Sequence, residues 1–242
     1  NFEADLQYLV ALAKSHGLSK LEFYATSLDF FQNPNLVREQ LEILAKVRKE
    51  SGVDVRVRCL SCFTSFIDAE KIIPNLKDLL YRAGLSCIGF GSDGADKKIW
   101  KTQRKQHNTV RRLIRCVVLC QRMKIRAEIL MVFGFPEDTR QTLTKAIALS
   151  LRAIKKWDDV IIRPYLAKPF IPGNEGWLID QVAVERVLED PQLFCKLDFC
   201  AIGSRLTHPR FFHRWMCNAA YLFICAVLTP IGRCTTSPLL PQ

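Results

Sequence analysis

The feature that most constrains the fold is a strand-like segment that recurs about every 30 to 40 residues, each time followed by a helix-like segment. The strand-like segments cover residues 20–26, 53–60, 85–91, 125–133 and 158–165. Parallel neighbouring strands need a long return connection, which a helix supplies. The alternation therefore predicts an α/β fold with a parallel sheet, arranged as an open or closed β/α barrel.

Capping residues mark several helix boundaries between these segments. Asn33 offers a helix cap with Pro34 in the first turn, and Thr139 opens a later helix. A single helix is predicted between a cap at Asp68 and a terminating Gly84. The helices alternate with the strands, as a barrel requires.

The alternation fades after residue 165, where prolines and glycines indicate a loop. We predict a core barrel, residues 1–165, and a loop-rich, helical C-terminal extension, residues 166–242. Helices are expected around residues 182–188 and 211–227 of the extension. The apolar residues 219–231 are too few for a membrane span of roughly 20 residues, so we expect them to be buried and no membrane to be crossed.

Charge and cysteine content narrow the class of protein. The formal charge of +11 is concentrated in residues 97–126, which hold eleven Lys and Arg and no acid. Such a patch can bind nucleic acid or an anionic partner, but a solvated helix face is the favoured interpretation. Ten cysteines without a signal segment indicate reduced thiols in a cytoplasmic protein.

Local motifs predict neither a metal site nor a nucleophile. Cys59 and Cys62 form a C-x-x-C pair, which can be half of a metal site or a redox dithiol. Cys116 and Cys120 lie four apart on a predicted helix without nearby histidines, so we expect buried free cysteines instead. The sequence has no G-x-S-x-G elbow and no Walker loop, and no catalytic residue is assigned.

In parallel α/β sheets, ligands bind at the carboxyl ends of the strands, where the strand-to-helix loops gather. The corresponding loops here are residues 26–29, 59–64, 91–94, 133–138 and 164–168. A ligand site is therefore expected among them.

Several of these strand ends resemble those of radical S-adenosylmethionine (SAM) enzymes. That family shows a helix ending in Ala-Gly, a strand ending in Gly-x-Glu-Ser or a variant, a lysine further on, and a later strand ending in Gly-x-Pro-Gly-Glu-Thr. The letters here are Ala83-Gly84, Gly91-Ser92-Asp93, Lys105, and Gly134-Phe135-Pro136-Glu137-Asp138-Thr139. The resemblance spans residues 6–165 and is most specific in residues 79–144.

The resemblance implies a partial (β/α)6 TIM-like barrel with SAM lying across the strand ends. In the family, a C-x3-C-x2-C loop binds a 4Fe–4S cluster, at which SAM is reductively cleaved to start radical chemistry on a substrate. An external electron donor of the flavodoxin or ferredoxin type is implied as a partner.

The sequence departs from the family at the cluster loop, because no C-x3-C-x2-C occurs in its 242 residues. The chain opens with Asn1 and a helix of the kind expected just after that loop. We therefore expect a fragment that lacks the first strand and the cluster loop. The cluster ligands would lie outside this chain, which alone would be inactive.

The resemblance also implies which residues contact SAM. Thr26 and Asp29 fall where the family binds the SAM amino group, although its usual Gly-Gly-Glu-like letters are absent. Ser92 and Asp93 match the strand end that contacts the ribose or the methionine part, and Lys105 could pair with the SAM carboxylate.

The strand end at Phe133 and Gly134 matches the one beside the adenine. A glycine there lets the backbone approach the ring, and an apolar side chain can pack on it. Glu137 and Asp138 follow in the first turn of a helix, where their capping role is at least as strong an interpretation as a contact with SAM.

Three further possibilities stay open. Residues 163–177 resemble the barrel exit of radical SAM proteins with a cobalamin-binding domain, which makes cobalamin a second implied cofactor. The basic residues 97–126 favour an RNA-modifying, methylthiotransferase-like relative, but no RNA-binding module is recognisable, so a nucleic-acid partner is not expected. The last alternative is a non-catalytic barrel remnant that binds SAM or a partner protein.

Overall fold

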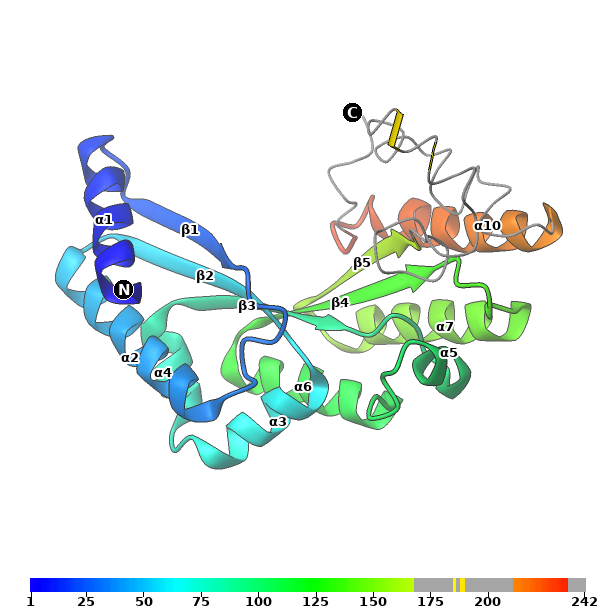
Figure 1. Ribbon diagram of the computed structural model, residues 1–242, viewed down its shortest axis with the longest axis horizontal. Helices are drawn as coiled ribbons and strands as arrows, with labels where there is room; N and C mark the ends of the chain where they lie inside the picture. Colours follow the sequence, from blue (N-terminus) through cyan, green and yellow to red (C-terminus); the bar gives the residue numbers. More distant parts are fainter. Residues whose placement is uncertain (168–184, 186–187, 190–210, 235–242) are drawn as a thin grey trace. The chain divides into compact units, whose positions relative to one another are not determined.

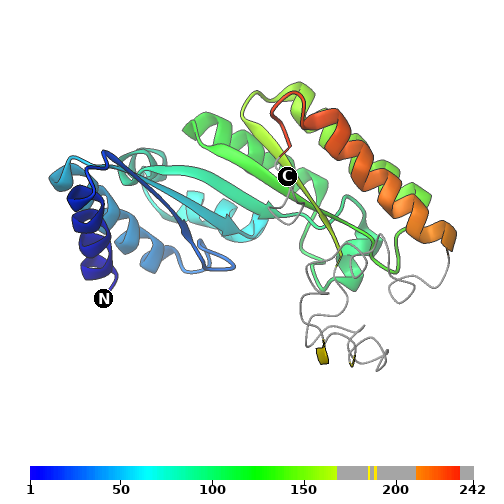
Figure 2. The same ribbon diagram turned by 90° about the horizontal axis from the view of Figure 1, so that it is seen from above.

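The computed structural model, shown in Figure 1 and Figure 2, describes residues 1–167, 185, 188–189 and 211–234. Its five strands form one sheet in which the spatial order follows the chain order. The strands are β1 (Lys20–Ala25), β2 (Asp54–Ser61), β3 (Leu85–Gly91), β4 (Arg126–Phe133) and β5 (Val160–Leu166). Strand β2 pairs in parallel with β1 and with β3, and helices occupy every connection between strands. The predicted α/β fold with a parallel sheet is confirmed.

The chain divides into two compact units, each of which is described by itself. The first comprises Asn1–Gly91 and Val110–Ile129, and the second comprises Ser92–Thr109 and Leu130–Gln242. The division at residue 165 expected from the sequence stays a prediction.

The first unit is a helix-covered sheet. Its helices are α1 (Phe2–Ser15), α2 (Pro34–Ser51), α3 (Phe63–Ile72), α4 (Leu76–Ala83) and α6 (Val110–Met123). Figure 1 shows α2, α3, α4 and α6 on one side of β1, β2 and β3. Because side chains alternate along a strand, one set faces these helices, and Val55, Val57 and Cys59 of β2 are almost fully buried there. Arg56 and Arg58 belong to the opposite face of the sheet.

Aromatic side chains pack together at the edge of the first unit where β1, β2 and β3 end. Phe66 packs against Phe31 at a ring-centroid distance of 5.0 Å and against Phe90 at 5.6 Å. Phe90 ends the buried run of β3, and all three rings are fully buried. Large buried aromatic rings contribute strongly to a core, so this cluster fixes the loops that follow β1 and β2.

The predicted helix between Asp68 and Gly84 is wrong, because the structure has two helices there. Helix α3 starts at Phe63 and contains Asp68 in its interior, while α4 starts at Leu76. Pro74 restricts the residue before it to extended backbone, and Asn75 adopts a left-handed φ of 54°. Gly84 does end α4 in a left-handed conformation, as predicted.

The second unit holds α5 (Lys97–Thr102), α7 (Arg140–Lys156), β5 and α10 (Phe211–Leu228). Helix α10, predicted as residues 211–227, packs against α7 and β5. The short α5 was not predicted. The helix expected at residues 182–188 falls largely outside the described residues, of which 185 and 188 are helical.

The basic residues of α6 occupy its solvent-facing side. Arg111, Arg112 and Arg115 are exposed, while Leu113 and Cys116 on the other side are buried. This arrangement agrees with the interpretation of a solvated helix face. Among the described residues, no helix combines the length and the apolar character that crossing a membrane needs.

Substitution of Gly84 tests the packing between α4 and β2. A Cβ at Gly84 would lie 2.1 Å from the Val55 carbonyl oxygen, and its φ of 77° is already unfavourable for a side chain. We expect Gly84→Ala to lower the free energy of unfolding by about 3 kcal/mol in urea denaturation.

Gly52→Ala is the matched control, because Gly52 has a similar φ of 68° and a Cβ added there would have nothing within 4 Å. The left-handed backbone alone should cost about 1 kcal/mol there. Equal losses for both variants would contradict the close approach of Gly84 to β2.

Candidate functional site

The expected ligand residues lie in loops of both units, beginning in the first unit with the loop after β1. Thr26 is exposed directly after β1. Asp29 has a defined role, because its Oδ1 accepts hydrogen bonds from the Ser61 hydroxyl and the Cys62 N–H, both at 3.1 Å. Its Oδ2 accepts from the Ser65 hydroxyl at 2.6 Å. The Asp29 carboxylate therefore joins the loops after β1 and β2.

This contact explains how α3 begins. The N-cap position, Cys62, makes no side-chain capping hydrogen bond of its own. Free N–H groups at a helix start need acceptors, and Asp29 supplies one from a different loop. The Asp29 carboxylate already accepts three hydrogen bonds from protein groups. The SAM amino group expected to bind Asp29 would therefore compete with the hydrogen bonds that join the two loops.

In the second unit, the loop after β3 brings Asp93 and Lys105 together. Their Oδ2 and Nζ atoms are 2.5 Å apart, and 34% of the Lys105 side chain and 16% of the Asp93 side chain are exposed. Asp93 has a left-handed φ of 55°, which asparagine and aspartate tolerate better than most residues. Lys105 thus already has a carboxylate partner, and a SAM carboxylate would have to share it.

Ser92 lies inside this loop. It is completely buried, and its hydroxyl donates to the Gly94 carbonyl at 2.7 Å. Its own carbonyl accepts from the Trp100 indole N–H at 2.7 Å. Asp96 caps α5 and accepts a hydrogen bond from Lys145, which is the largest of the effects that lower the Asp96 pKa. These contacts fix the loop on α5 and α7.

The loop after β4 is built around the carboxylate of Asp138. Its Oδ2 accepts from the N–H groups of Gly134 and Phe135 at 2.9 and 3.0 Å, and its Oδ1 accepts from the Thr142 hydroxyl at 2.9 Å. Asp138 is only 5% exposed. Thr142 also completes a capping box with Thr139 at the start of α7. The sequence suggested Asp138 as a helix cap, whereas in the structure its carboxylate holds the turn together through these hydrogen bonds.

Two features make this loop suited to a ligand. Gly134 is buried with a φ of 101°, a conformation that excludes ordinary side chains. Glu137 keeps one carboxylate oxygen, Oε2, buried and without a hydrogen-bond partner among the described residues. An unpaired buried acceptor is costly, so an additional donor there would be stabilising. Phe133, expected beside the adenine, is fully buried.

A polar cluster that the sequence patterns did not predict lies on the face of the first unit opposite its helices. Arg58 of β2 donates to both carboxylate oxygens of Glu128 in β4, at 3.2 and 3.0 Å. Glu128 is 4% exposed, and Cys87 of β3 is also buried; burial is the main effect that raises the Cys87 pKa to about 11. An acid inside the apolar strand 125–133 was the sequence signal for this cluster.

The cysteines of the C-x-x-C pair occupy different surroundings. Cys59 is buried on the helix side of β2, which raises its pKa, while Cys62 is partly exposed. Cys116 is buried, and its thiol donates weakly to the Phe63 carbonyl at 3.5 Å. No three potential metal ligands cluster within the part of the chain that the structure describes.

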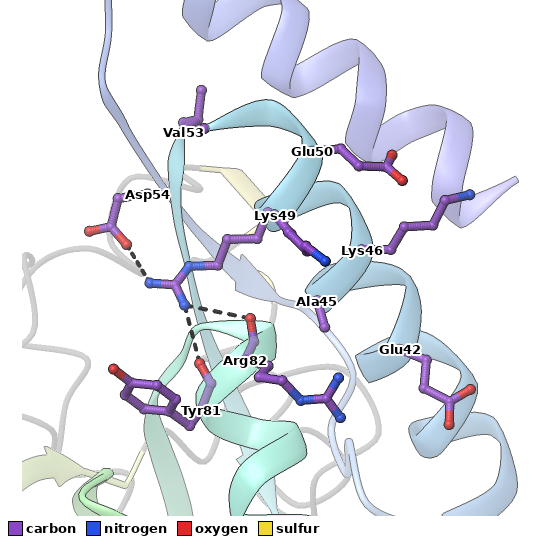
Figure 3. A pocket seen from close by; sticks show the side chains of 11 residues that line it. Glu42, Ala45, Lys46, Lys49, Glu50, Val53, Asp54, Tyr81 and Arg82 are labelled. Atoms are coloured by element: carbon purple, nitrogen blue, oxygen red, sulfur yellow. Dashed lines mark hydrogen bonds and ion pairs between the residues drawn. The ribbon is translucent and has the colours of Figure 1, made fainter.

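A groove of about 720 Å³ lies at the opposite end of the first unit, where β2 begins (Figure 3). Arg48 spans it, donating to Asp54 Oδ1 at 2.8 Å and to the Tyr81 carbonyl at 3.2 Å. Asp54 is the first residue of β2, so the groove faces the amino ends of the strands. That face stabilises such folds, whereas ligands bind at the other.

Replacing Asp138 tests the turn after β4. Asp138→Ala would leave two backbone N–H groups and one hydroxyl without their acceptor, so we expect a loss of about 3 kcal/mol in the free energy of unfolding. The control is Asp68→Ala, which removes an exposed ion pair with Lys71 and should change stability by less than about 0.5 kcal/mol. If Asp138→Ala changed the free energy of unfolding as little as Asp68→Ala in urea denaturation, the Asp138 carboxylate would not stabilise the turn.

Neither protein-family models nor curated protein sequences match this chain. Solved structures do match. The radical SAM methyltransferase TsrM from Kitasatospora setae, with cobalamin and a 4Fe–4S cluster bound, has a TM-score of 0.55 at 17% identity, over 71% of this chain and 32% of TsrM. Elp3 from Methanocaldococcus infernus has a TM-score of 0.51 at 11% identity, over 79% of this chain and 45% of Elp3.

Coproporphyrinogen III oxidase HemN from Escherichia coli, a radical SAM enzyme, has a TM-score of 0.50 at 14% identity, over 94% of this chain and 44% of HemN. The chain thus spans less than half the length of each of these proteins. At such identities the likeness concerns the fold, and it confirms the expected partial TIM-like barrel. The chain has the fold of the radical SAM enzymes.

Proposed function

We propose that this chain is the SAM-binding part of a radical SAM enzyme. The fold supports this function, and the observation that carries it is the loop after β4. There, the Asp138 carboxylate accepts hydrogen bonds from the Gly134 and Phe135 N–H groups. Gly134 has a positive φ and no side chain, and Glu137 Oε2 is buried without a partner among the described residues. A SAM hydroxyl or amine that donates to Glu137 would satisfy that oxygen.

The other predicted residues divide into ligand and support roles. Gly134 would let the adenine approach the backbone, and Phe133 would support the ring from the buried side. Lys105, held by Asp93, would offer its remaining N–H donors to the SAM carboxylate. Ser92 and Asp29 would act by fixing their loops, because their side chains already bond to protein groups. Thr26 is the remaining exposed candidate.

The residues present do not fit a 4Fe–4S cluster. The sequence lacks C-x3-C-x2-C, and the described residues contain no group of three potential metal ligands. We therefore propose that cluster ligands lie outside these 242 residues. Such a cluster supplies the electron for SAM cleavage. An external electron donor and a cytoplasmic location follow as parts of the same proposal.

For the second cofactor and the substrate, we propose only a chemical class. The TsrM structure contains cobalamin, which supports a cobalamin-dependent subgroup. The helix-free face that carries Arg58, Cys87 and Glu128 would face a substrate with polar groups. An RNA substrate has less support, since no RNA-binding module is recognisable in the sequence.

Calorimetric titration of the chain with SAM tests the binding role. Glu137→Ala removes the unpaired acceptor and should weaken binding about tenfold, the equivalent of one hydrogen bond to a charged group. Glu39→Ala, at an exposed position of α2, should leave the affinity unchanged. If Glu137→Ala binds SAM as tightly as Glu39→Ala does, Glu137 is not part of the binding site. If the unsubstituted chain shows no detectable binding of SAM, the proposed function is contradicted.

A separate experiment tests the enzyme. In the native protein that contains this chain, we expect a C-x3-C-x2-C segment, about four iron atoms per protomer after anaerobic reconstitution, and release of 5′-deoxyadenosine from SAM on reduction. Reactions with and without added cobalamin separate the two cofactor classes. A native protein that binds SAM without iron would establish the non-catalytic alternative.

A further inference from the structure

The groove at the amino end of β2 gathers positive charge from two helices. Its volume is about 720 Å³, and it is lined by Lys46, Arg48 and Lys49 of α2 and by Arg82 of α4. Ala45 and Lys49 are one helical turn apart, so they lie on the same face of α2. Figure 3 shows the Lys49 and Arg82 side chains approaching Ala45 from its two sides. Because the Ala45 side chain is a single methyl group, it leaves the groove between these two cations open.

Two of the four cations already have acidic partners. The Lys46 ammonium lies 2.8 Å from a carboxylate oxygen of Glu3. The Arg48 guanidinium donates to a carboxylate oxygen of Asp54, also at 2.8 Å. Each of these cations is therefore balanced by a carboxylate, and the other two cations determine the charge of the groove.

Lys49 and Arg82 carry the unbalanced charge. Both are exposed, and among the described residues neither side chain makes a hydrogen bond or an ion pair. The acids nearby are directed elsewhere: a carboxylate oxygen of Glu42 accepts from Arg38 at 2.9 Å, and the Glu50 side chain points away from Arg82 in Figure 3. Two unpaired like charges in one groove create a positive potential that attracts an anion.

We propose that this groove binds a phosphate group, held between Lys49 of α2 and Arg82 of α4. A phosphate monoester carries about 1.5 to 2 negative charges at neutral pH and offers three strong acceptor oxygens. Two cations match that charge, whereas a carboxylate would balance only one of them. The guanidinium can donate two parallel N–H bonds to phosphate oxygens, and the ammonium adds up to three further donors.

The rest of the groove suits the organic part of a phosphate ester. Its volume of about 720 Å³ falls within the range of roughly 300–1,000 Å³ that small-molecule sites occupy. Tyr81 lines the same groove and is 71% exposed, so its ring is available to pack against a ligand. The bound phosphate would join α2 to α4. Because the groove faces the amino ends of the strands, its ligand would take no part in a reaction at their carboxyl ends.

NMR titration of the whole chain tests the site. Inorganic phosphate and phenyl phosphate are added separately to the isotope-labelled protein, with the ionic strength held constant by sodium chloride. We expect saturable shifts of the amide signals at the carboxyl ends of α2 and α4. Lys49→Ala and Arg82→Ala should each weaken the affinity about tenfold, the equivalent of one hydrogen bond between charged groups. Lys77→Ala is the matched control, because it removes the same charge from an exposed position of α4 outside the groove and should leave the affinity unchanged.

The two probes separate the sources of the phosphate. If phenyl phosphate binds more tightly and Tyr81→Ala removes the difference, the groove takes a phosphate ester; if both bind equally, it takes the free ion. Shifts that do not saturate, or equal affinities for Lys49→Ala, Arg82→Ala and Lys77→Ala, would overturn the proposal. Because Lys49 and Arg82 are exposed, both variants should unfold at the same urea concentration as the unsubstituted chain. Their affinity for SAM should also be unchanged, so this test is independent of the proposed function.

Discussion

The parallel sheet and its helical crossovers are the constraint on which the rest of the structure depends. A parallel strand can be followed by another only after the chain has returned along the sheet, so every strand ends in a loop on the same edge. In the first unit, the apolar side of that sheet is buried by helices, with Val55, Val57 and Cys59 facing them. The opposite face is then available for polar side chains such as Arg58 and Glu128.

Hydrogen-bonded carboxylates fasten the loops at the strand ends. Asp29 joins the turns after β1 and β2, and Asp138 gathers two backbone N–H groups and one hydroxyl after β4. Each carboxylate replaces water with several charge-assisted hydrogen bonds, which makes its turn rigid. A ligand at these ends would therefore meet loops in which Asp29, Asp93 and Asp138 are already bonded to protein groups, whereas Glu137 keeps one buried oxygen without a partner among the described residues. That difference separates the residues that shape the site from those free to bind.

Sequence patterns predicted the regular elements well because their signals are local. The strands, the Asn33 and Thr139 caps and the apolar α10 all depend on neighbours a few residues away. The prediction failed where two local effects competed: the apolar run from Ile72 to Leu80 favoured one helix, but Pro74 and the left-handed Asn75 divide it. The role of Asp29 was invisible, since Ser61 and Ser65 lie more than 30 residues away in the chain.

By itself, the sequence determined the α/β class, the order of the strands along the chain and the loops that carry polar residues, because hydrophobic periodicity and turn chemistry act over short distances. Only the tertiary structure decided which polar groups are paired. Asp29 with Ser65, Arg58 with Glu128, and Asp93 with Lys105 meet through the packing of separate elements. Pairing, burial and pKa depend on distance in space, and one-dimensional patterns do not contain that distance.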